Sequence, residues 1–415
     1  MRYKIVIILI ALILLNGLNN ARELNQMAIV LAIGIDKVED NEFLITAFIT
    51  NPQKQDSGSS SGEEKSTVLY KSKGNTIQNA LRKIILESPK PLYLAHMKLL
   101  LISEEVAKDG LENSIDFFIR NYETNNGYNF VIVKNAQAQE VLELESPIED
   151  TVVENITRSI EFTARDLGIC NNNTLNDTLK KVIEGKEEVT IPSIIVKNEK
   201  NNDNNNEQSA QKGTMNKESE DQVSSDNENK GSSSEKNISD LKIIVDSMAY
   251  FKDNKLQGYL TQQESMMCNI LNNDSKKIVL EVNGEENFVA EFTSISSKKE
   301  ARVENGEYFM DIEVNGVCNI TEIKRDSESL NKNNVEIYKK EIEDTLENQI
   351  NEYIKKCQNL YKTDILGYEN LYMKKLNKEY KSISDIFSDE IFSKIKSDVS
   401  VNVKIPNDGG IYKKW

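Results

Sequence analysis

Side chains that commonly carry catalysis are sparse in this sequence. The single histidine, His96, lies within the apolar stretch 92–102. A histidine-based triad or metal site needs further groups at a defined spacing, and the sequence offers none around this imidazole. We therefore expect His96 to be a structural residue of a strand over 92–102, with contact to a partner protein as the alternative role.

Other catalytic motifs are equally weak. Residues 58–62 match the letters of the GxSxG motif, but they lie in a polar Ser/Gly-rich tract, 53–66, with neither a strand before them nor a helix after them. The nucleophile elbow requires that scaffold. No Walker loop and no GxGxxG occurs, and residues 201–207 lack the glycine and the spacing of an EF-hand. The sequence predicts no enzyme activity, no cofactor and no metal site.

The cysteines do not form a recognisable ligand set. Four are present and they lie far apart, without a CxxC pair: Cys170, Cys268, Cys318 and Cys357. The spacing therefore disfavours a zinc ribbon or a thioredoxin-type site. We expect four separate buried thiols, with a disulfide between two of them as the alternative.

Composition narrows the class of protein. The chain has 415 residues, a formal net charge of −16 and a pI near 4.9. A strongly acidic chain is repelled by phosphate backbones, so nucleic-acid binding is disfavoured. The hydrophobic content of 38% suits globular domains rather than a multi-span protein. The length predicts two or three domains.

Residues 1–20 predict a signal or anchor segment. Arg2 and Lys4 precede an apolar run over 5–15, as in an export signal. As a helix this run would measure about 16 Å, against a hydrocarbon core of about 30 Å. An uncleaved short anchor is favoured; cleavage, lipidation by another route and a buried cytosolic helix are the alternatives. Residues 15–18 resemble a lipobox with Leu18 at the cysteine position, so no lipid is expected there.

The part that follows, 21–197, predicts a mixed α/β domain. Strand patterns and helical patterns alternate along it, which favours a sheet covered by helices. The helix after residue 74 would begin at Asn75, with Gln78 completing a capping-box-like pair. The predicted strands are 27–36, 43–50, 68–71, 92–102 and 130–134, and later helices are 110–120, a segment reaching 167, and 175–183.

Residues 198–238 differ from everything around them. Their composition of Asn, Ser, Glu and Lys cannot bury enough apolar surface to offset ordering, so we expect a disordered insertion or linker. As a flexible coil its ends would lie about 35 Å apart.

The remaining chain predicts a middle strand-rich domain, 239–290, and a C-terminal α+β domain, 291–415. Strands are expected at 243–251, 255–259, 277–282 and 288–295, then a hairpin around the Asn-Gly of 314–317, and a last strand at 399–405. A long helix over 335–361 carries an apolar core stripe made of Ile342, Leu346, Ile350, Tyr353, Cys357 and Leu360. The fold class is thus multidomain α+β: three domains of mixed sheets with packed helices.

Four stretches, in order, resemble one family. Residues 22–36 begin with Arg22-Glu23 and end at Asp36; 88–110 contain His96; 251–260 contain Gly258 and are followed by Glu264; and 363–369 contain Asp364 and Gly367 after the long helix. Together they are similar to the Ger(x)C family, the C subunit of spore nutrient germinant receptors. The resemblance covers nearly the whole chain after the signal segment.

The resemblance implies a non-enzymatic subunit on the extracytoplasmic face of the spore inner membrane. It would act with a multi-span A subunit and a membrane-embedded B subunit in nutrient-triggered germination. The family usually has Cys and Trp where this chain has Leu18 and Asn19, and tract 198–237 resembles an insertion. The motif residues would serve partner contact: Arg22, Glu23, Asp36, His96, Gly258, Glu264, Asp364 and Gly367.

Two other functions are alternatives to a receptor subunit, and several motif residues have an alternative structural role. An extracytoplasmic solute-binding protein would need two similar lobes around a cleft, whereas the two halves here are unequal. A secreted hydrolase lacks its nucleophile motif. Among the motif residues, Arg22-Glu23 could simply start a solvated segment, Asp36 could end a strand by turn chemistry, and Asp364 could cap the turn after the long helix.

Overall fold

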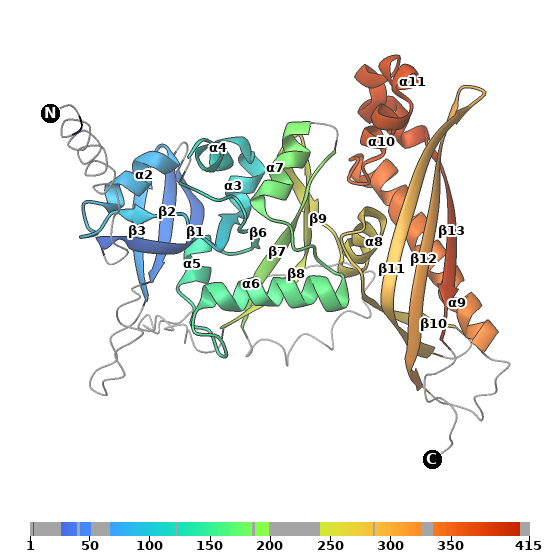
Figure 1. Ribbon diagram of the computed structural model, residues 1–415, viewed down its shortest axis with the longest axis horizontal. Helices are drawn as coiled ribbons and strands as arrows, with labels where there is room; N and C mark the ends of the chain where they lie inside the picture. Colours follow the sequence, from blue (N-terminus) through green and yellow to red (C-terminus); the bar gives the residue numbers. More distant parts are fainter. Residues whose placement is uncertain are drawn as a thin grey trace, which may run out of the picture.

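The computed structural model describes Tyr3 and residues 26–39, 42–50, 67–121, 123–184, 187–198, 241–284, 287–324 and 335–406. The predictions for segment 1–20 beyond Tyr3, for Leu18, Arg22 and Glu23, for motif 58–62 and for 199–238 lie outside these residues. The architecture is α+β with two mixed sheets, one N-terminal and one C-terminal, as predicted (Figure 1).

The N-terminal sheet has a parallel centre and antiparallel flanks. Its order is β3-β2-β1-β5-β6-β7-β8-β9, and β4 pairs with β1. β1 with β5, β5 with β6 and β6 with β7 are parallel, which buries the central strands on both faces. The strands are β1 (Ala28–Glu39), β2 (Glu42–Thr50), β3 (Thr67–Gly74), β4 (Leu92–Tyr93), β5 (Leu99–Ser103), β6 (Asn129–Lys134), β7 (Thr190–Asn198), β8 (Leu241–Lys252) and β9 (Lys255–Tyr259).

Helices cover both faces of this sheet. On one face lie α2 (Ile77–Ile84), α3 (Glu104–Asp109), α4 (Glu112–Arg120) and α7 (Leu175–Glu184). On the other lie α5 (Ala138–Leu142) and α6 (Val152–Phe162), the latter followed by a π-helical turn, Thr163–Leu167. Successive strand residues point to opposite faces, so Leu99 and Leu101 contact one helix layer while Leu100 and Ile102 contact the other.

Two of the local predictions in this domain were wrong. Residues 92–102 form two strands, because β4 pairs with the start of β1 and β5 with its middle, and a turn at His96 joins them. The helix expected over 110–120 is present as α4, and Gly110, whose φ of 126° is not helical, separates it from α3. The cap of α2 is Thr76, whose hydroxyl accepts from the Asn79 N–H at 3.1 Å.

The tract 199–240 connects two neighbouring strands of one sheet. Asn198 of β7 and Leu241 of β8 are register partners in an antiparallel pair. Paired Cα atoms lie about 5 Å apart, so the expected end-to-end distance of about 35 Å was wrong. The strand pairing, and not the coil statistics of the tract, sets this distance.

The strands expected in a middle domain are divided between the two sheets. β8 and β9 extend the N-terminal sheet, whereas β10 (Ile278–Asn283) belongs to the C-terminal one. Helix α8 (Gln262–Asn272) lies between the sheets (Figure 1). Within the described ranges, 239–290 therefore forms no sheet of its own; the division of the chain into domains stays a prediction.

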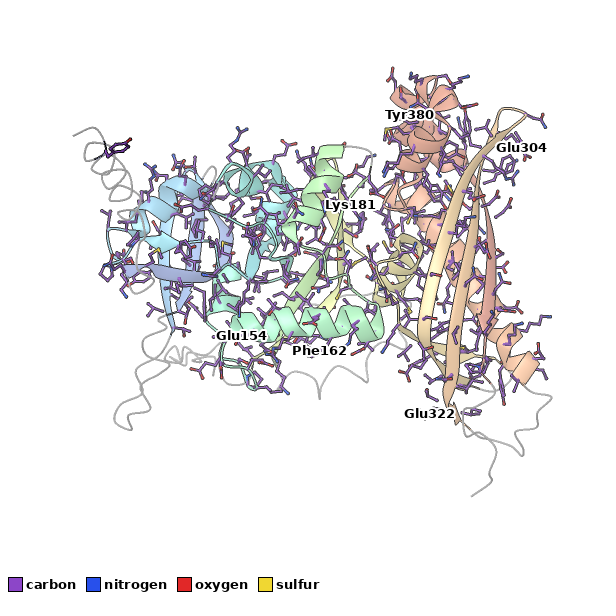
Figure 2. All side chains as sticks on the ribbon, in the orientation of Figure 1. Glu154, Phe162, Lys181, Glu304, Glu322 and Tyr380 are labelled. Atoms are coloured by element: carbon purple, nitrogen blue, oxygen red, sulfur yellow. The ribbon has the colours of Figure 1, made fainter. Side chains whose placement is uncertain are left out.

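The C-terminal sheet is built on a long hairpin. Its order is β10-β11-β12-β13, with β11 (Asn287–Glu304), β12 (Glu307–Lys324) and β13 (Lys396–Lys404), and β13 runs parallel to β12. Figure 2 shows Glu304 and Glu322 at opposite ends of this hairpin. Helices α9 (Val335–Lys356), α10 (Tyr368–Lys375) and α11 (Asn377–Lys381) accompany it.

The hairpin turn is at Asn305-Gly306 and not in 314–317. Asn305 and Gly306 have φ of 51° and 82°, as a two-residue hairpin turn requires. Gly316 instead lies inside β12 opposite Ile295, where a Cβ would come within 2.5 Å of the Phe292 ring. In this second Asn-Gly pair the glycine allows the Phe292 ring to pack closely against the strand, and the hairpin turn expected there was wrong.

The long helix was predicted correctly. α9 ends at Lys356 and continues as a π-helical turn, Cys357–Tyr361. The predicted burial of Leu360 was wrong, because this side chain is 68% exposed, whereas the other stripe residues, Ile342, Leu346, Ile350, Tyr353 and Cys357, are buried. They belong to a continuous core that runs from the α5–α6 face of the first sheet through α8 to the second sheet.

Candidate functional site

Asp36 is a structural cap. The carboxylate, buried at the end of β1, accepts hydrogen bonds from the backbone N–H groups of Ala138 (2.7 Å) and Gln139 (2.9 Å), at the start of α5. Burial raises the pKa of Asp36, and the two N–H donors oppose that effect. Its contacts therefore hold a helix on the sheet, through residues distant in sequence.

His96 and Gly258 occupy different places. His96 is exposed in the turn between β4 and β5. Its ring and that of Tyr93 form a T-shaped pair with centroids 5.4 Å apart. Gly258 of β9 lies opposite Tyr250 of β8, and a Cβ there would come within 3.0 Å of the tyrosine ring. The glycine leaves room for the Tyr250 ring. This ring packs in a tilted arrangement against the ring of Tyr361, at the end of the long helix, with centroids 4.7 Å apart.

Glu264 links the first turn of α8 to the end of α9. It forms a capping box with Thr261, and its buried carboxylate accepts from Lys356 Nζ at 2.6 Å. Burial alone would raise the pKa of Glu264, but the hydrogen bonds from Lys356 and the Thr261 N–H hold it below its usual value. The carboxylate is therefore ionised at neutral pH and joins two helices.

Asp364 and Gly367 shape the turn between the long helix and α10. The Asp364 carboxylate accepts from the backbone N–H groups of Tyr368 (3.1 Å) and Glu369 (2.7 Å). Burial raises its pKa to about 6. Gly367 has a φ of 70°, and a Cβ there would collide with the Glu187 carboxylate. The expected capping role of Asp364 is thus confirmed, for α10.

These features gather at one junction between the two sheets. Asn272 Nδ2 donates to the Ile365 carbonyl at 3.1 Å, and Lys299 of β11 donates to Asn272 Oδ1 at 3.0 Å and to the Leu366 carbonyl. Burial lowers the pKa of Lys299. A cavity of about 160 Å³ adjoins the turn, and its walls include Glu187 and Asp364.

The structure thus brings together Gly258, Glu264, Asp364 and Gly367, while Asp36 and His96 lie elsewhere in the N-terminal sheet. Sequence reasoning missed the junction residues Tyr250, Lys299, Lys356 and Tyr361. Only Glu264 carried a local signal, the Thr-x-x-Glu spacing of a capping box. This arrangement can hold the two sheets in a fixed relation.

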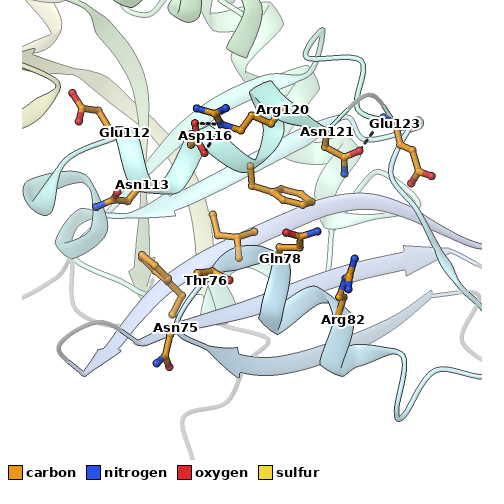
Figure 3. Close-up of a pocket in the computed structure, with 13 residues that line it drawn as sticks. Asn75, Thr76, Gln78, Arg82, Glu112, Asn113, Asp116, Arg120, Asn121 and Glu123 are labelled. Atoms are coloured by element: carbon orange, nitrogen blue, oxygen red, sulfur yellow. Dashed lines mark hydrogen bonds and ion pairs between the residues drawn. The ribbon is translucent and has the colours of Figure 1, made fainter.

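A larger opening lies away from the junction. Helices α2 and α4 form the walls of a groove of about 1000 Å³, shown in Figure 3. Its apolar lining residues are Phe43, Ile77 and Phe117. On the α4 wall, Arg120 Nε donates to both oxygens of Asp116, at 2.7 and 2.9 Å.

The cysteines and the other possible metal-ligating side chains are placed apart or buried in the part of the chain that the structure describes. That part holds no cluster of three or more His, Cys, Asp or Glu suited to a metal ion. All four cysteines are free and buried, as predicted for thiols. Burial raises the pKa of Cys170 and Cys318 to about 12 and that of Cys268 to about 11, which suppresses thiolate formation.

Family models match most of the chain. A model described as the spore germination protein N-terminal domain matches residues 20–196, and one described as spore germination B3/GerAC like, C-terminal, matches residues 246–409. The chain belongs to the Ger(x)C family of germinant receptor C subunits. The residues between the two matches contain the polar tract 199–240.

Individual spore germination proteins are also similar to this chain in sequence. Spore germination protein KC of Bacillus subtilis (strain 168) is 29% identical over 195 residues, 46% of this chain and 48% of that protein. Spore germination protein A3 of the same organism is 27% identical over 173 residues, 40% and 45% of the two chains. The chain thus matches about half the length of each of these curated relatives.

A solved structure shares the fold. The crystal structure of the GerBC protein superposes with a TM-score of 0.52 at 17% identity, and covers 90% of this chain and 97% of that one. The similarity in fold extends across both sheets. Within the described ranges, no helix combines the length and apolar composition needed to cross a bilayer.

Proposed function

We propose that this Ger(x)C protein is a non-enzymatic, extracytoplasmic subunit of a germinant receptor, held at the spore inner membrane. It acts with a multi-span A-type and a membrane-embedded B-type subunit in nutrient-triggered germination. The main observation in favour is the order of the two germination domains along one chain. The basic start followed by the apolar run 5–15 supports export and membrane association.

The structure of the family-like motifs supports a scaffold role. Asp36, Glu264 and Asp364 each place a carboxylate on backbone N–H groups at the start of a helix. Such contacts fix the shape of the molecule and leave its outer surfaces for partners. A solute-binding protein is less well supported, because its two lobes would be similar, whereas the described sheets have nine strands and four.

The test is recovery of the complex from spores. A tagged chain is purified from detergent-solubilised spore inner membranes, and we expect A-type and B-type subunits to co-purify in constant ratio. Deleting the gene should lower the amounts of both partners and abolish the response to the nutrient. Equal recovery of the partners from an untagged control, or unchanged levels in the deletion strain, would overturn the proposal.

A further inference from the structure

The groove between α2 and α4 has walls of opposite charge. The α2 wall carries Asn75, Thr76, Gln78 and Arg82, without an acidic residue. The α4 wall carries Glu112 and Glu123 at its ends, while Asp116 is neutralised by Arg120. A group bound in this groove therefore meets a positive wall on one side and a negative wall on the other.

Two of these charges are available for binding. Arg82 is exposed, and its guanidinium has no hydrogen bond or ion pair to another described residue, although its carbonyl accepts from the Ile85 N–H at 3.2 Å. Glu123 is likewise unpaired through its side chain within the described ranges; its backbone N–H donates to Asn121 Oδ1 at 2.9 Å. Figure 3 shows Arg82 and Glu123 at the same end of the groove, on opposite walls. No ion pair joins them within those ranges.

The walls are held rigidly by the core beneath them. Ile77 and Ile84 of α2, and Ile115 and Phe118 of α4, are buried in the core on this face of the sheet. Side-chain amides on both walls, such as Gln78 and Asn113, can donate to and accept from a peptide backbone. Because the walls are fixed before binding, an occupant would meet little ordering cost on this side.

The shape favours a polypeptide over a small molecule. A small-molecule pocket encloses most of its ligand with largely apolar walls. Here the wall residues Asn75, Gln78 and Arg82 are exposed, and most of the lining residues are polar or charged. In an extended chain, successive side chains point to opposite sides, so neighbouring residues of opposite charge match opposite walls.

We propose that this groove binds an extended segment of a partner protein in which an acidic side chain adjoins a basic one. The acidic side chain pairs with Arg82 and the basic one with Glu123. The apolar lining residues Phe43, Ile77 and Phe117 contact the aliphatic stems of the bound segment. This surface lies away from the junction around Asp364, so binding here leaves the junction contacts intact.

Photocrosslinking from the groove tests the proposal in the full chain. A benzophenone amino acid replaces Gln78, and the crosslinked peptide is identified by mass spectrometry from sporulating cells. We expect one segment of another protein with adjacent acidic and basic residues. Arg82→Glu and Glu123→Lys should each lower the yield at least tenfold, and reversing the matching charge on the partner should restore it.

A neighbouring lysine provides the matched control. Lys83 lies on the same helix, but its ammonium donates to the Lys73 carbonyl at 2.8 Å and does not line the groove. Lys83→Glu should therefore leave the yield within twofold, and all three variants should keep the wild-type unfolding midpoint. A yield unchanged by Arg82→Glu and Glu123→Lys would overturn the proposal.

Two other outcomes also decide it. A crosslink to residues 199–240 of the same chain, which contain Glu235-Lys236, would show an internal occupant and overturn a partner site. A crosslinked segment without charged neighbours would overturn it as well. The test is separate from the receptor proposal, because the crosslink is scored whether or not the A-type and B-type subunits co-purify.

Discussion

Individual carboxylates in this protein hold backbone rather than perform chemistry. Asp36 reaches the start of α5 and Asp364 the start of α10, and each receives two N–H donors there. Both are buried, so solvent cannot replace these contacts. Replacement of either residue should therefore change stability first and receptor function only as a consequence.

Gly367→Ala should destabilise the protein through the backbone. A non-glycine residue at a left-handed position costs about 1–2 kcal/mol, and the new methyl group also meets Glu187. Gly306→Ala is a matched control, because Gly306 has a φ of 82° with nothing within 4 Å of a Cβ. Urea unfolding should show a larger loss for Gly367→Ala; equal losses would mean that the Glu187 contact carries no cost.

Asp364 should make stability depend on pH. Its folded pKa of about 6 lies above the ordinary 3.8, so its contribution is full below about pH 4 and is lost as pH rises through 6. The difference corresponds to roughly 3 kcal/mol at about 1.4 kcal/mol per pKa unit. Between pH 4.5 and 7.5, wild type should lose stability relative to Asp364→Asn in urea titrations. Parallel curves would contradict this.

Helices were easier to predict than turns, for a physical reason. The stripe of α9 repeats over many residues, and each buried position confirms the same face. Asn-Gly occurs at both 305–306 and 315–316, and local chemistry cannot choose between them. Pairing along the full β11–β12 ladder decides it, and that pairing is a property of the whole hairpin.

Two polar positions on α9 show contacts that the apolar stripe does not predict. Glu343 and Lys356 lie off the apolar stripe, which favours solvent exposure for both. Glu343 Oε1 instead accepts the Val403 N–H of β13 at 2.8 Å, and Lys356 pairs with Glu264. Both partners lie distant in the sequence, and one chain alone gives no signal for such contacts.

Leu346→Asp should prevent α9 from packing on the second sheet. Leu346 is fully buried, and an unpaired charge there costs several kcal/mol or is neutralised by a shifted pKa. We expect loss of the folded protein and of its partners in spores. Asp344→Lys, an exposed change on the same helix, should alter stability by under about 0.5 kcal/mol. Normal accumulation of Leu346→Asp would show that the buried face is wrong.

The pair between α8 and α9 should show measurable coupling. Glu264 is nearly buried and Lys356 half-exposed, at 2.6 Å. Glu264→Gln, Lys356→Met and the double variant form a cycle, for which we expect a coupling energy of about 1 kcal/mol, above that of a fully exposed pair. High salt should reduce it only partly. If the effects of the single variants are additive, the Glu264–Lys356 pair does not stabilise the contact between α8 and α9. The Tyr250–Tyr361 contact would then be the one that fixes this region.

At the scale of the molecule, two sheets share one core across α8. Chain order alone suggested a separate middle unit, because strand patterns resume after the polar tract. The registers place β8 and β9 against β7, and β10 against β11. Sheet membership depends on long-range pairing, which a strand pattern does not encode.

Membrane attachment should not require a lipid. Diacylglyceryl transfer needs a thiol, and the sequence has no cysteine before Cys170. We expect no label on the protein in cells fed radiolabelled palmitate, while the protein still fractionates with membranes. Leu18→Cys is the matched gain-of-function control and should acquire label. Label on the wild-type protein would contradict this expectation.

The register pairing of Asn198 with Leu241 has a practical consequence. Because the two ends of the connection are fixed side by side, an inserted domain whose own termini are close together could be placed between them without separating β7 from β8. A fluorescent reporter at this position would follow the receptor in living spores. Loop-closure cost rises by only about 0.6 kcal/mol per doubling of length, so shortened or enlarged versions should fold alike.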